Sequence, residues 1–300
     1  MTGRVVLVTG AGGFTGRHLV PALRAAGYRV VGLGREGSPA DTDVDCDLRD
    51  PRAVREAVAA VRPTHVVHLA ALAFVAHADE RAFYDVNLFG CLHLLDALHA
   101  LPQGPRKVLI ASSANVYGTP GVETIDETVC PAPVNHYACS KLAMEHMVRT
   151  WFGRLPIVLA RPFNYTGVGQ SESFLIPKIV KHFTQRAERI QLGNLDVSRD
   201  FSDVRDVVSA YVALLESEVH SETFNVCSGR AVALRDLLQM VGRLTGHALR
   251  VEVDSALVRK DEIASLRGSH QKLSRAVGFT PRYSLEQTLA WMATGEKSSA

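Results

Sequence analysis

The 300-residue sequence has few of the features that mark metal-binding, disulfide-linked, membrane or nucleic-acid-binding proteins. Its five cysteines are scattered, with no CxxC pair, so neither a structural zinc site nor a disulfide framework is expected. The 33 basic and 31 acidic residues form no blocks, which gives no electrostatic reason to expect nucleic acid or a membrane surface as a partner. The longest weakly charged stretch, around residues 65–78, is too short to span a bilayer. Residues 4–9 form a strand-like run with no signal-peptide pattern before it, so we expect a cytoplasmic protein.

The twelve histidines also lack the companions of a metal site. His65 and His68 lie three residues apart in an apolar strand, which directs them to opposite faces. His77, His136 and His146 have no carboxylate or cysteine partners in the sequence pattern. We therefore expect no catalytic metal.

Short β-branched runs alternate with longer amphipathic segments over the first half of the chain. The apolar runs cover residues 4–9, 28–33, 65–70, 107–112 and 156–161, and the helical segments cover residues 15–26, 51–61, 81–99 and 137–151. Apolar strands separated by helices indicate a parallel sheet covered on both faces, that is, a doubly wound Rossmann sheet. After residue 162 the pattern changes to a Gly/Ser-rich loop and a helix near residues 174–186.

We therefore predict an α/β protein with two parts. The Rossmann domain covers residues 1–163 and is completed by a return segment at about residues 198–227. A smaller C-terminal substrate-binding lobe covers residues 164–197 and 228–300.

The first predicted strand runs into a glycine-rich turn, TGAGGFTG, at residues 9–16. The GxxGxxG spacing of Gly10, Gly13 and Gly16 allows a tight turn, a close approach of the backbone to a pyrophosphate, and a helix N-terminus directed at its charge. Because the turn lies between a strand and a helix, we predict a dinucleotide site here. Its other expected contacts in the turn are Gly12, Phe14 and Thr15.

The end of the second predicted strand bears on the choice between NAD and NADP. A carboxylate there would accept a hydrogen bond from the adenosine ribose, but none precedes Arg35, whose guanidinium suits a 2′-phosphate. Arg35 therefore favours NADP(H). Because Glu36 beside it could neutralise its charge, NAD(H) remains open. Asp47 and Leu48 are predicted to lie near the adenine.

Tyr137 and Lys141 stand at positions i and i+4 of a predicted helix and project from one face of it. Ser113 ends the preceding strand and is expected in the same crevice, at the carboxyl ends of the strands. A phenol with a pKa of about 10 is a poor acid–base group at neutral pH, but a nearby ammonium and an oxidised nicotinamide both favour the phenolate. The three residues suit hydride transfer at a carbonyl or alcohol: Tyr137 moves the proton, Lys141 tunes it and Ser113 orients the oxygen.

Six short motifs extend this pattern over nearly the whole chain: TGAGGFTG, HLAA (68–71), NLFG with Asn87, SSANVYG (112–118), YACSK (137–141) and RPFN (161–164). Together they resemble the extended short-chain dehydrogenase/reductases that act on nucleotide-sugars.

The resemblance implies Ser113, Tyr137 and Lys141 as the catalytic set. It implies further cofactor contacts in the HLAA and RPFN motifs, by Leu69, Ala70, Ala71, Arg161 and Phe163, and a sugar contact by Asn164. It also implies a homodimer joined through a four-helix bundle of residues 81–99 and 137–151.

The second half is similar to the GDP-4-keto-6-deoxy-D-mannose reductases in RPFNYTGVGQ (161–170), GNLDVSRDFSDVRDVVSAY (193–211), NVCSG (225–229) and RGSH (267–270). Residues 259–263, RKDEI, are similar to the guanosine-diphosphate segment of GDP-mannose 4,6-dehydratases. Arg199 and Arg259 suit a diphosphate because they are permanently charged forks, Lys178 is a further candidate, and Glu262 suits ribose hydroxyls. Tyr165 replaces a histidine that is common in those reductases, which leaves the sugar contact there open.

Position 115 separates the possible reactions. Dehydratases of this kind carry an acidic residue two positions before the tyrosine of the VYG turn, whereas this chain has Asn115 before Tyr117. An amide cannot shuttle a proton at neutral pH, although it can bind a substrate hydroxyl. We therefore predict that NAD(P)H reduces the C4 keto group of GDP-4-keto-6-deoxy-D-mannose to GDP-D-rhamnose, a deoxysugar donor for surface polysaccharide, while Tyr117 serves in packing.

Four alternatives remain open. The product could have the opposite C4 configuration, that of 6-deoxytalose, or the substrate could be a heptose analogue. A nucleotide-sugar epimerase would recycle its cofactor rather than consume it. A cofactor-sensing protein without chemistry is the non-enzymatic alternative, and the intact Ser113, Tyr137 and Lys141 argue against it.

Overall fold

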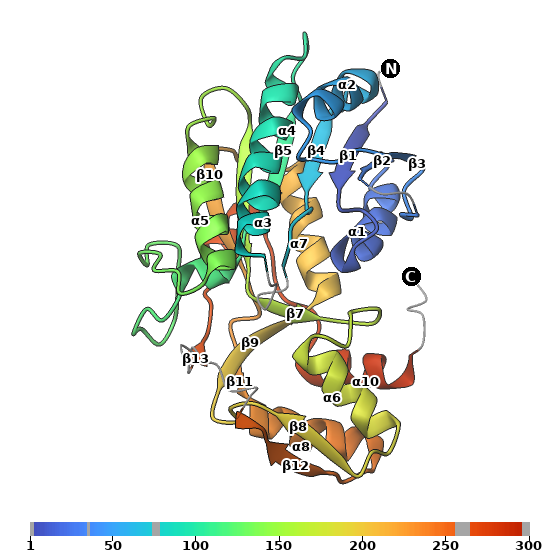
Figure 1. Cartoon of the computed structure of the whole chain (residues 1–300), viewed down its shortest axis with the longest axis vertical. Helices are drawn as coiled ribbons and strands as arrows, with labels where there is room; N and C mark the ends of the chain where they lie inside the picture. The colour runs from blue at the N-terminus through green and yellow to red at the C-terminus, as the bar shows by residue number, and fades with distance from the viewer. Residues whose placement is uncertain (1–2, 35–36, 74–78, 256–264, 296–300) are drawn as a thin grey trace.

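The computed structural model describes residues 3–34, 37–73, 79–255 and 265–295. Within these residues, seven parallel strands form the main sheet in the order β3-β2-β1-β4-β5-β6-β10 (Figure 1). They are β1 (Val5–Thr9), β2 (Arg29–Leu33), β3 (Thr42–Val44), β4 (His65–His68), β5 (Lys107–Ala111), β6 (Ile157–Pro162) and β10 (Glu222–Val226). The order reverses between β1 and β4, so the sheet is doubly wound and the predicted fold class is confirmed.

Helices cover both faces of this sheet. One face carries α1 (Phe14–Ala25) and α7 (Val204–Glu216), and the other carries α2 (Pro51–Val61), α4 (Gly90–His99) and α5 (His136–Arg149). Each face has its own apolar core. Val6 and Val8 of β1 enter the first core, and Leu7 enters the second. Burial on both sides explains why this strand is apolar throughout instead of alternating with polar residues.

The segment predicted as one helix over residues 81–99 is continuous but irregular. It begins as α3 (Glu80–Tyr84), passes through a π-helical turn, η1 (Asp85–Phe89), and continues as α4. Asn87 lies in the π turn and is fully buried. Its side-chain amide donates to the Ser140 hydroxyl of α5 at 3.0 Å, so the irregular turn joins the two helices.

The second lobe has a smaller sheet of its own, below the main sheet in Figure 1. Its strands are β7 (Asn164–Thr166), β9 (Ser198–Asp203), β11 (Ala231–Ala233) and β13 (Ser265–Leu266), and β8 (Arg189–Leu192) pairs separately with β12 (Arg250–Val253). The helices α6 (Leu175–Thr184), α8 (Leu234–Thr245) and α10 (Leu285–Thr294) enclose a third apolar core. The remaining helix, α9 (Gln271–Val277), packs against β10 of the main sheet.

The return to the main sheet starts later than predicted. Residues 198–203 form β9 and belong to the smaller sheet, so the returning segment begins with α7 and supplies one strand, β10. The sequence of β9, SRDFSD, has one apolar residue, Phe201, whereas the strands of the main sheet are largely apolar.

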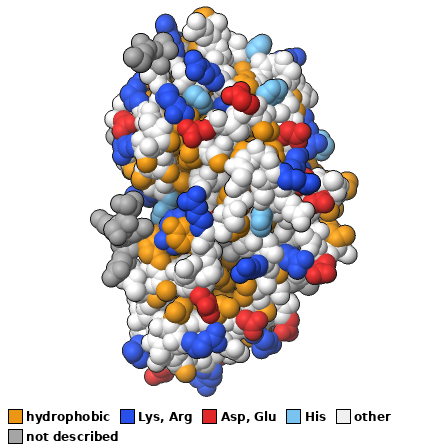
Figure 2. Space-filling model, turned by 180° about the vertical axis from the view of Figure 1, so that it is seen from behind, with side chains coloured by type: hydrophobic (Ala, Val, Ile, Leu, Met, Phe, Trp, Pro, Cys, Tyr) orange, Lys and Arg blue, Asp and Glu red, His pale blue; other side chains and the backbone are white. Residues whose placement is uncertain are grey.

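Basic and acidic side chains are interspersed over the face shown in Figure 2, so the near-neutral balance of the sequence also holds locally there. None of the helices formed by the described residues is long and apolar enough to cross a membrane. In the same residues, no three His, Cys, Asp or Glu side chains are grouped so that they could hold a metal ion.

Candidate active site

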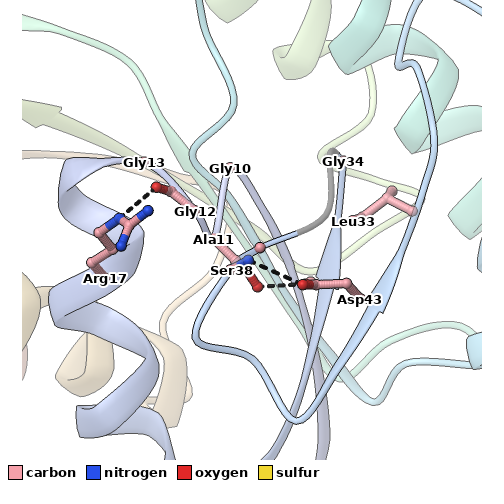
Figure 3. Close-up of a pocket in the computed structure, with 11 residues that line it drawn as sticks. Gly10, Ala11, Gly12, Gly13, Arg17, Leu33, Gly34, Ser38 and Asp43 are labelled. Carbon is pink, nitrogen blue, oxygen red and sulfur yellow. Dashed lines mark hydrogen bonds between the residues drawn. The ribbon is translucent and has the colours of Figure 1, made fainter.

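The glycine-rich turn after β1 forms one wall of a pocket of about 300 Å³ (Figure 3). Gly10 has a φ of +73°, which side-chain-bearing residues rarely adopt. A Cβ atom on Gly16 would lie 2.4 Å from the carbonyl oxygens of Gly10 and Ala11. The spacing seen in the sequence is thus required by the fold of the turn itself, and it leaves the backbone open to a ligand.

The start of α1 suits the pyrophosphate of a dinucleotide. Gly13 is the N-cap, and within the described chain no side chain caps this end of the helix. Uncapped amides and the helix dipole favour an anion at such a position. Arg17 also lines the pocket, and its Nε donates to the Gly12 carbonyl at 2.9 Å. The permanent positive charge of Arg17 also favours an anion at the start of α1.

The opposite wall of the pocket contains an acidic residue that the sequence analysis missed. Asp43 of β3 accepts hydrogen bonds from the amide and the hydroxyl of Ser38. Both residues line the pocket with Gly32 and Gly34 at the end of β2. A carboxylate therefore lies near the expected adenosine site, although it comes from the next strand. Arg35, the predicted 2′-phosphate ligand, lies outside the described residues.

The prediction for Asp47 and Leu48 finds no support in this geometry. The Asp47 carboxylate pairs with Arg49 at 2.6 Å, and Leu48 is buried in the core. The Leu48 carbonyl accepts from the His93 imidazole of α4. The side chains of both residues are therefore engaged within the protein.

The predicted cofactor loop after β4 begins beside the glycine turn. The amide of Leu69 donates to the Thr9 carbonyl, and the amide of Ala70 donates to the Thr9 hydroxyl, both at 3.1 Å. A Cβ atom on Gly10 would lie 2.9 Å from the Ala70 nitrogen. Thr9 thus holds the loop that continues into Ala71 against the pocket.

The three predicted catalytic residues come together at the carboxyl end of β5. Ser113 follows this strand, caps the 3₁₀-helix η2 (Ala114–Tyr117), and is hydrogen-bonded to the Tyr137 phenol. Tyr137 and Lys141 lie on the buried face of α5. The Lys141 ammonium donates to the Ala111 carbonyl of β5 at 2.9 Å, which fixes the lysine beside the same strand end.

Burial dominates the electrostatics of this group. It raises the pKa of Tyr137 to about 12, while the hydrogen bond from Ser113 acts in the opposite direction. Burial also lowers the pKa of Lys141 to about 8, while Cys91 and Glu145 act in the opposite direction. In the protein alone, the Tyr137 phenol is therefore protonated at neutral pH. The expected effect of Lys141 together with a bound oxidised nicotinamide stays a prediction.

Arg161 requires a correction, because its guanidinium is used inside the protein. Nε and Nη2 donate to the two carboxylate oxygens of Glu145 at 2.8 and 2.5 Å, and Nη1 donates to the Tyr117 hydroxyl at 2.9 Å. Arg161 and Glu145 are 2% and 1% exposed. The Tyr117 hydroxyl in turn donates to Asn225. The side chain of Arg161 therefore joins β6 to α5 instead of facing the cofactor, and Tyr117 packs in the core, as predicted.

The residues after Arg161 divide between core and crevice. Phe163 packs near Tyr117 in a small apolar cluster, which leaves its expected cofactor contact without support. The Asn164 side-chain nitrogen is buried and has no hydrogen-bond partner among the described residues, so it is available to a ligand. Tyr165 bonds to the Thr15 hydroxyl at 2.8 Å and stacks on Phe14. The tyrosine that replaces histidine therefore reaches the glycine turn.

Some of the predicted substrate-binding residues lie among the described residues, and others do not. Asn115 lies in η2, and its backbone N–H donates to the Ser113 hydroxyl. Arg199 lies on β9, where its guanidinium donates to the Ser198 carbonyl, and the Lys178 ammonium donates to the Gln191 carbonyl of β8. Arg259 and Glu262 lie outside the described residues, so their predicted contacts remain predictions.

A model of the "NAD dependent epimerase/dehydratase family" matches residues 6–227, which covers the main sheet and the candidate catalytic residues. The chain belongs to this family. The family is NAD dependent, and the pocket beside the glycine-rich turn fits an NAD(P) cofactor.

Two curated relatives match nearly the whole chain. GDP-6-deoxy-D-talose 4-dehydrogenase of Aggregatibacter actinomycetemcomitans is 34% identical over 93% of this chain and 92% of its own length. GDP-6-deoxy-D-mannose reductase of Pseudomonas aeruginosa is 35% identical over 96% of this chain and 95% of its own length.

Two solved structures show the same architecture. A Burkholderia cenocepacia protein, provisionally assigned as an epimerase, is 50% identical with a TM-score of 0.91, and the match covers 97% of each chain. RMD from Pseudomonas aeruginosa in complex with NADPH is 33% identical with a TM-score of 0.85, and the match covers 98% of this chain and 97% of that one.

Proposed function

We propose that the protein uses NAD(P)H to reduce the C4 keto group of GDP-4-keto-6-deoxy-D-mannose to GDP-D-rhamnose. The observation that carries this proposal is an intact Ser113–Tyr137 pair beside an amide, Asn115, at the position where a dehydratase needs an acid. The 35% identity to a GDP-6-deoxy-D-mannose reductase supports the same assignment.

In this reaction the reduced nicotinamide, when bound, supplies a hydride to C4. Tyr137 gives its proton to the C4 oxygen as the carbon–oxygen double bond is reduced to an alcohol. Ser113 donates a hydrogen bond to the same oxygen and orients it. In the protein alone, the raised pKa of Tyr137 keeps its phenol protonated, and a reduction takes its proton from this form. An epimerase would first need the phenolate, because its first step removes a proton from an alcohol.

The opposite C4 configuration is a second candidate, because the GDP-6-deoxy-D-talose 4-dehydrogenase is similar over most of both chains. The configuration depends on which face of the sugar meets the nicotinamide. Asn164 and Asn115 are the described residues that we expect to hold the sugar in one of the two orientations.

For the cofactor we propose NADP(H), with NAD(H) as the alternative. The guanidinium of Arg35 suits a 2′-phosphate, and a similar structure contains NADPH. Asp43 acts against this preference unless its charge remains engaged by Ser38. Initial rates with NADPH and NADH, in the wild-type protein and in Arg35→Gln, measure the balance directly.

We also propose that two copies associate through the helices α3–α4 and α5. These helices pack side by side on one face of the sheet, and Phe89 between α3 and α4 is 47% exposed. Light scattering coupled to size exclusion should give twice the chain mass, and Phe89→Glu should reduce it to one.

The mechanistic part of the proposal is tested by Tyr137→Phe, which removes only the hydroxyl. Turnover of GDP-4-keto-6-deoxy-D-mannose should fall about 1,000-fold, while cofactor affinity stays close to that of the wild type. Tyr28→Phe is a matched control, because its hydroxyl bonds to Arg4 far from the site. Normal turnover by a folded, cofactor-binding Tyr137→Phe protein would contradict the assignment.

A further inference from the structure

The buried ion pair between Glu145 and Arg161 lies directly behind the catalytic residues. Glu145 follows Tyr137 and Lys141 at intervals of four residues, so all three occupy one face of α5. Each of the three is buried. The carboxylate therefore lies on the face of the helix that meets the end of β5.

Glu145 holds both sides of the site at once. Its Oε1 accepts from the Ser112 hydroxyl at 2.6 Å and from the Arg161 Nε at 2.8 Å. Ser112 immediately precedes Ser113, whose hydroxyl bonds to Tyr137. The same carboxylate thus joins the helix that carries Tyr137 to the strand end that carries Ser113.

We propose that Glu145 is a positioning residue for the reaction at Tyr137: it clamps the end of β5 to α5 and supplies the fixed negative charge that faces Lys141. This proposal rests on the proposed function, since it assigns the residue that keeps Ser113, Tyr137 and Lys141 in their relative positions.

The charges around Lys141 support the second part of this role. Besides Glu145, the groups that face its ammonium are the Cys91 thiol of α4, the His68 imidazole of β4 and the Ala111 carbonyl of β5. Burial keeps the thiol and the imidazole uncharged, because it raises the pKa of Cys91 to about 12 and lowers that of His68 to about 3. Among these described groups, Glu145 is the one that forms an ion pair, with Arg161.

Two substitutions separate position from charge. Glu145→Gln keeps the shape but removes the charge, so kcat should fall about 100-fold and the basic limb of the kcat–pH profile should move to lower pH. Glu145→Asp keeps the charge but shortens the reach, so kcat should fall less and the basic limb should stay at the wild-type pH. The dissociation constant for NADPH should change less than about threefold in both.

Asp203→Asn is the matched control for general destabilisation. Asp203 is also a buried carboxylate held by an arginine fork, that of Arg205, but it ends β9 and caps α7, so it belongs neither to α5 nor to the end of β5. This variant should lose thermal stability and keep both kcat and the pH profile. The same loss of kcat in Asp203→Asn, or a wild-type kcat and basic limb in Glu145→Gln, would overturn the proposal.

Two further measurements keep the test decisive. If Glu145→Gln does not fold, as judged by circular dichroism, the double variant with Arg161→Gln removes both buried charges, and a wild-type kcat in it would overturn the proposal.

If the wild-type protein turns over no GDP-ketosugar, the proposed function fails, and ¹³C NMR of labelled Tyr137 replaces kcat. Its titration should then shift in Glu145→Gln and not in Asp203→Asn, and an unshifted titration would overturn the positioning role.

Discussion

The glycine turn and the neighbouring part of the second lobe are built in different ways. In the turn, the backbone fills the space, and Gly16 has carbonyl oxygens where a Cβ would stand. In the second lobe, the buried carboxylate of Asp200 collects hydrogen bonds from the amides of Ser228, Gly229 and Gly268 and holds three segments together. Changes in the turn should therefore act through sterics, whereas changes in the second lobe should act through charge.

The largest effect is expected for Gly16→Ala, which places a methyl group against two backbone carbonyls. Because neither carbonyl can move without opening the turn, we expect a loss of more than about 3 kcal/mol in stability and cofactor affinity together. Thermal melting with and without NADPH measures both. Gly153→Ala is the control, since its Cβ would meet nothing within 4 Å. A Gly16→Ala protein that binds NADPH normally would show that the turn is not built by close backbone packing.

Acid should destabilise the Rossmann domain through His68, which lies beside Thr9. Burial lowers the pKa of His68 from 6.5 to about 3, so the unfolded chain binds a proton that the folded one does not. This contribution to stability is complete above pH 6.5 and decreases as the pH falls toward 3. The loss of stability amounts to about 3 kcal/mol by pH 4. Urea unfolding of the wild type and of His68→Gln at pH 7 and pH 4 should show the smaller loss in the variant; equal losses would exclude His68 as the cause.

In the second lobe, Arg199→Gln should raise the KM for the GDP-sugar about 30-fold. The substitution removes about 2 kcal/mol of a charge-assisted contact with the diphosphate. Because Arg199 lies on β9 and outside the glycine turn, the dissociation constant for NADPH should not change. Arg235→Gln, at an exposed ion pair with Asp196, serves as the control. If NADPH binding weakens as much as substrate binding, the two regions are not separate in function.

The smallest effect is expected for Tyr165→Phe, which joins the two regions. The variant keeps the stacking on Phe14 and loses the hydrogen bond to Thr15, which contributes about 1 kcal/mol. A fall of about fivefold in NADPH affinity, measured by fluorescence quenching, is the expected result. An unchanged affinity would indicate that the bond serves only to pack the lobes.

The elements that the sequence predicted well have strong local signals. The apolar runs at residues 4–9 and 107–112, the glycine spacing and the i, i+4 pair of Tyr137 and Lys141 all specify their own geometry. Their meeting at one end of the sheet follows from parallel topology, because the carboxyl ends of parallel strands share an edge.

The features that the sequence did not predict depend on tertiary packing. The strand β3 is three residues long and has no apolar pattern, so Asp43 could not be assigned to the pocket. Arg161 was expected at the cofactor because of the family resemblance of the RPFN motif. The partner that neutralises it, Glu145, lies sixteen residues earlier and on another element. A buried arginine needs such a partner, but the sequence does not say which acid supplies it.

The proposed reaction consumes a reduced nicotinamide to reduce C4 of a GDP-ketosugar. The most direct measurement incubates the protein with GDP-4-keto-6-deoxy-D-mannose and a limiting amount of NADPH, follows absorbance at the nicotinamide band, and assigns C4 of the product by NMR. One NADPH oxidised per product, with the D-rhamnose configuration, is the predicted result. A product formed without cofactor consumption would identify an epimerase, and no NADPH or NADH oxidation at all would contradict the reductase assignment.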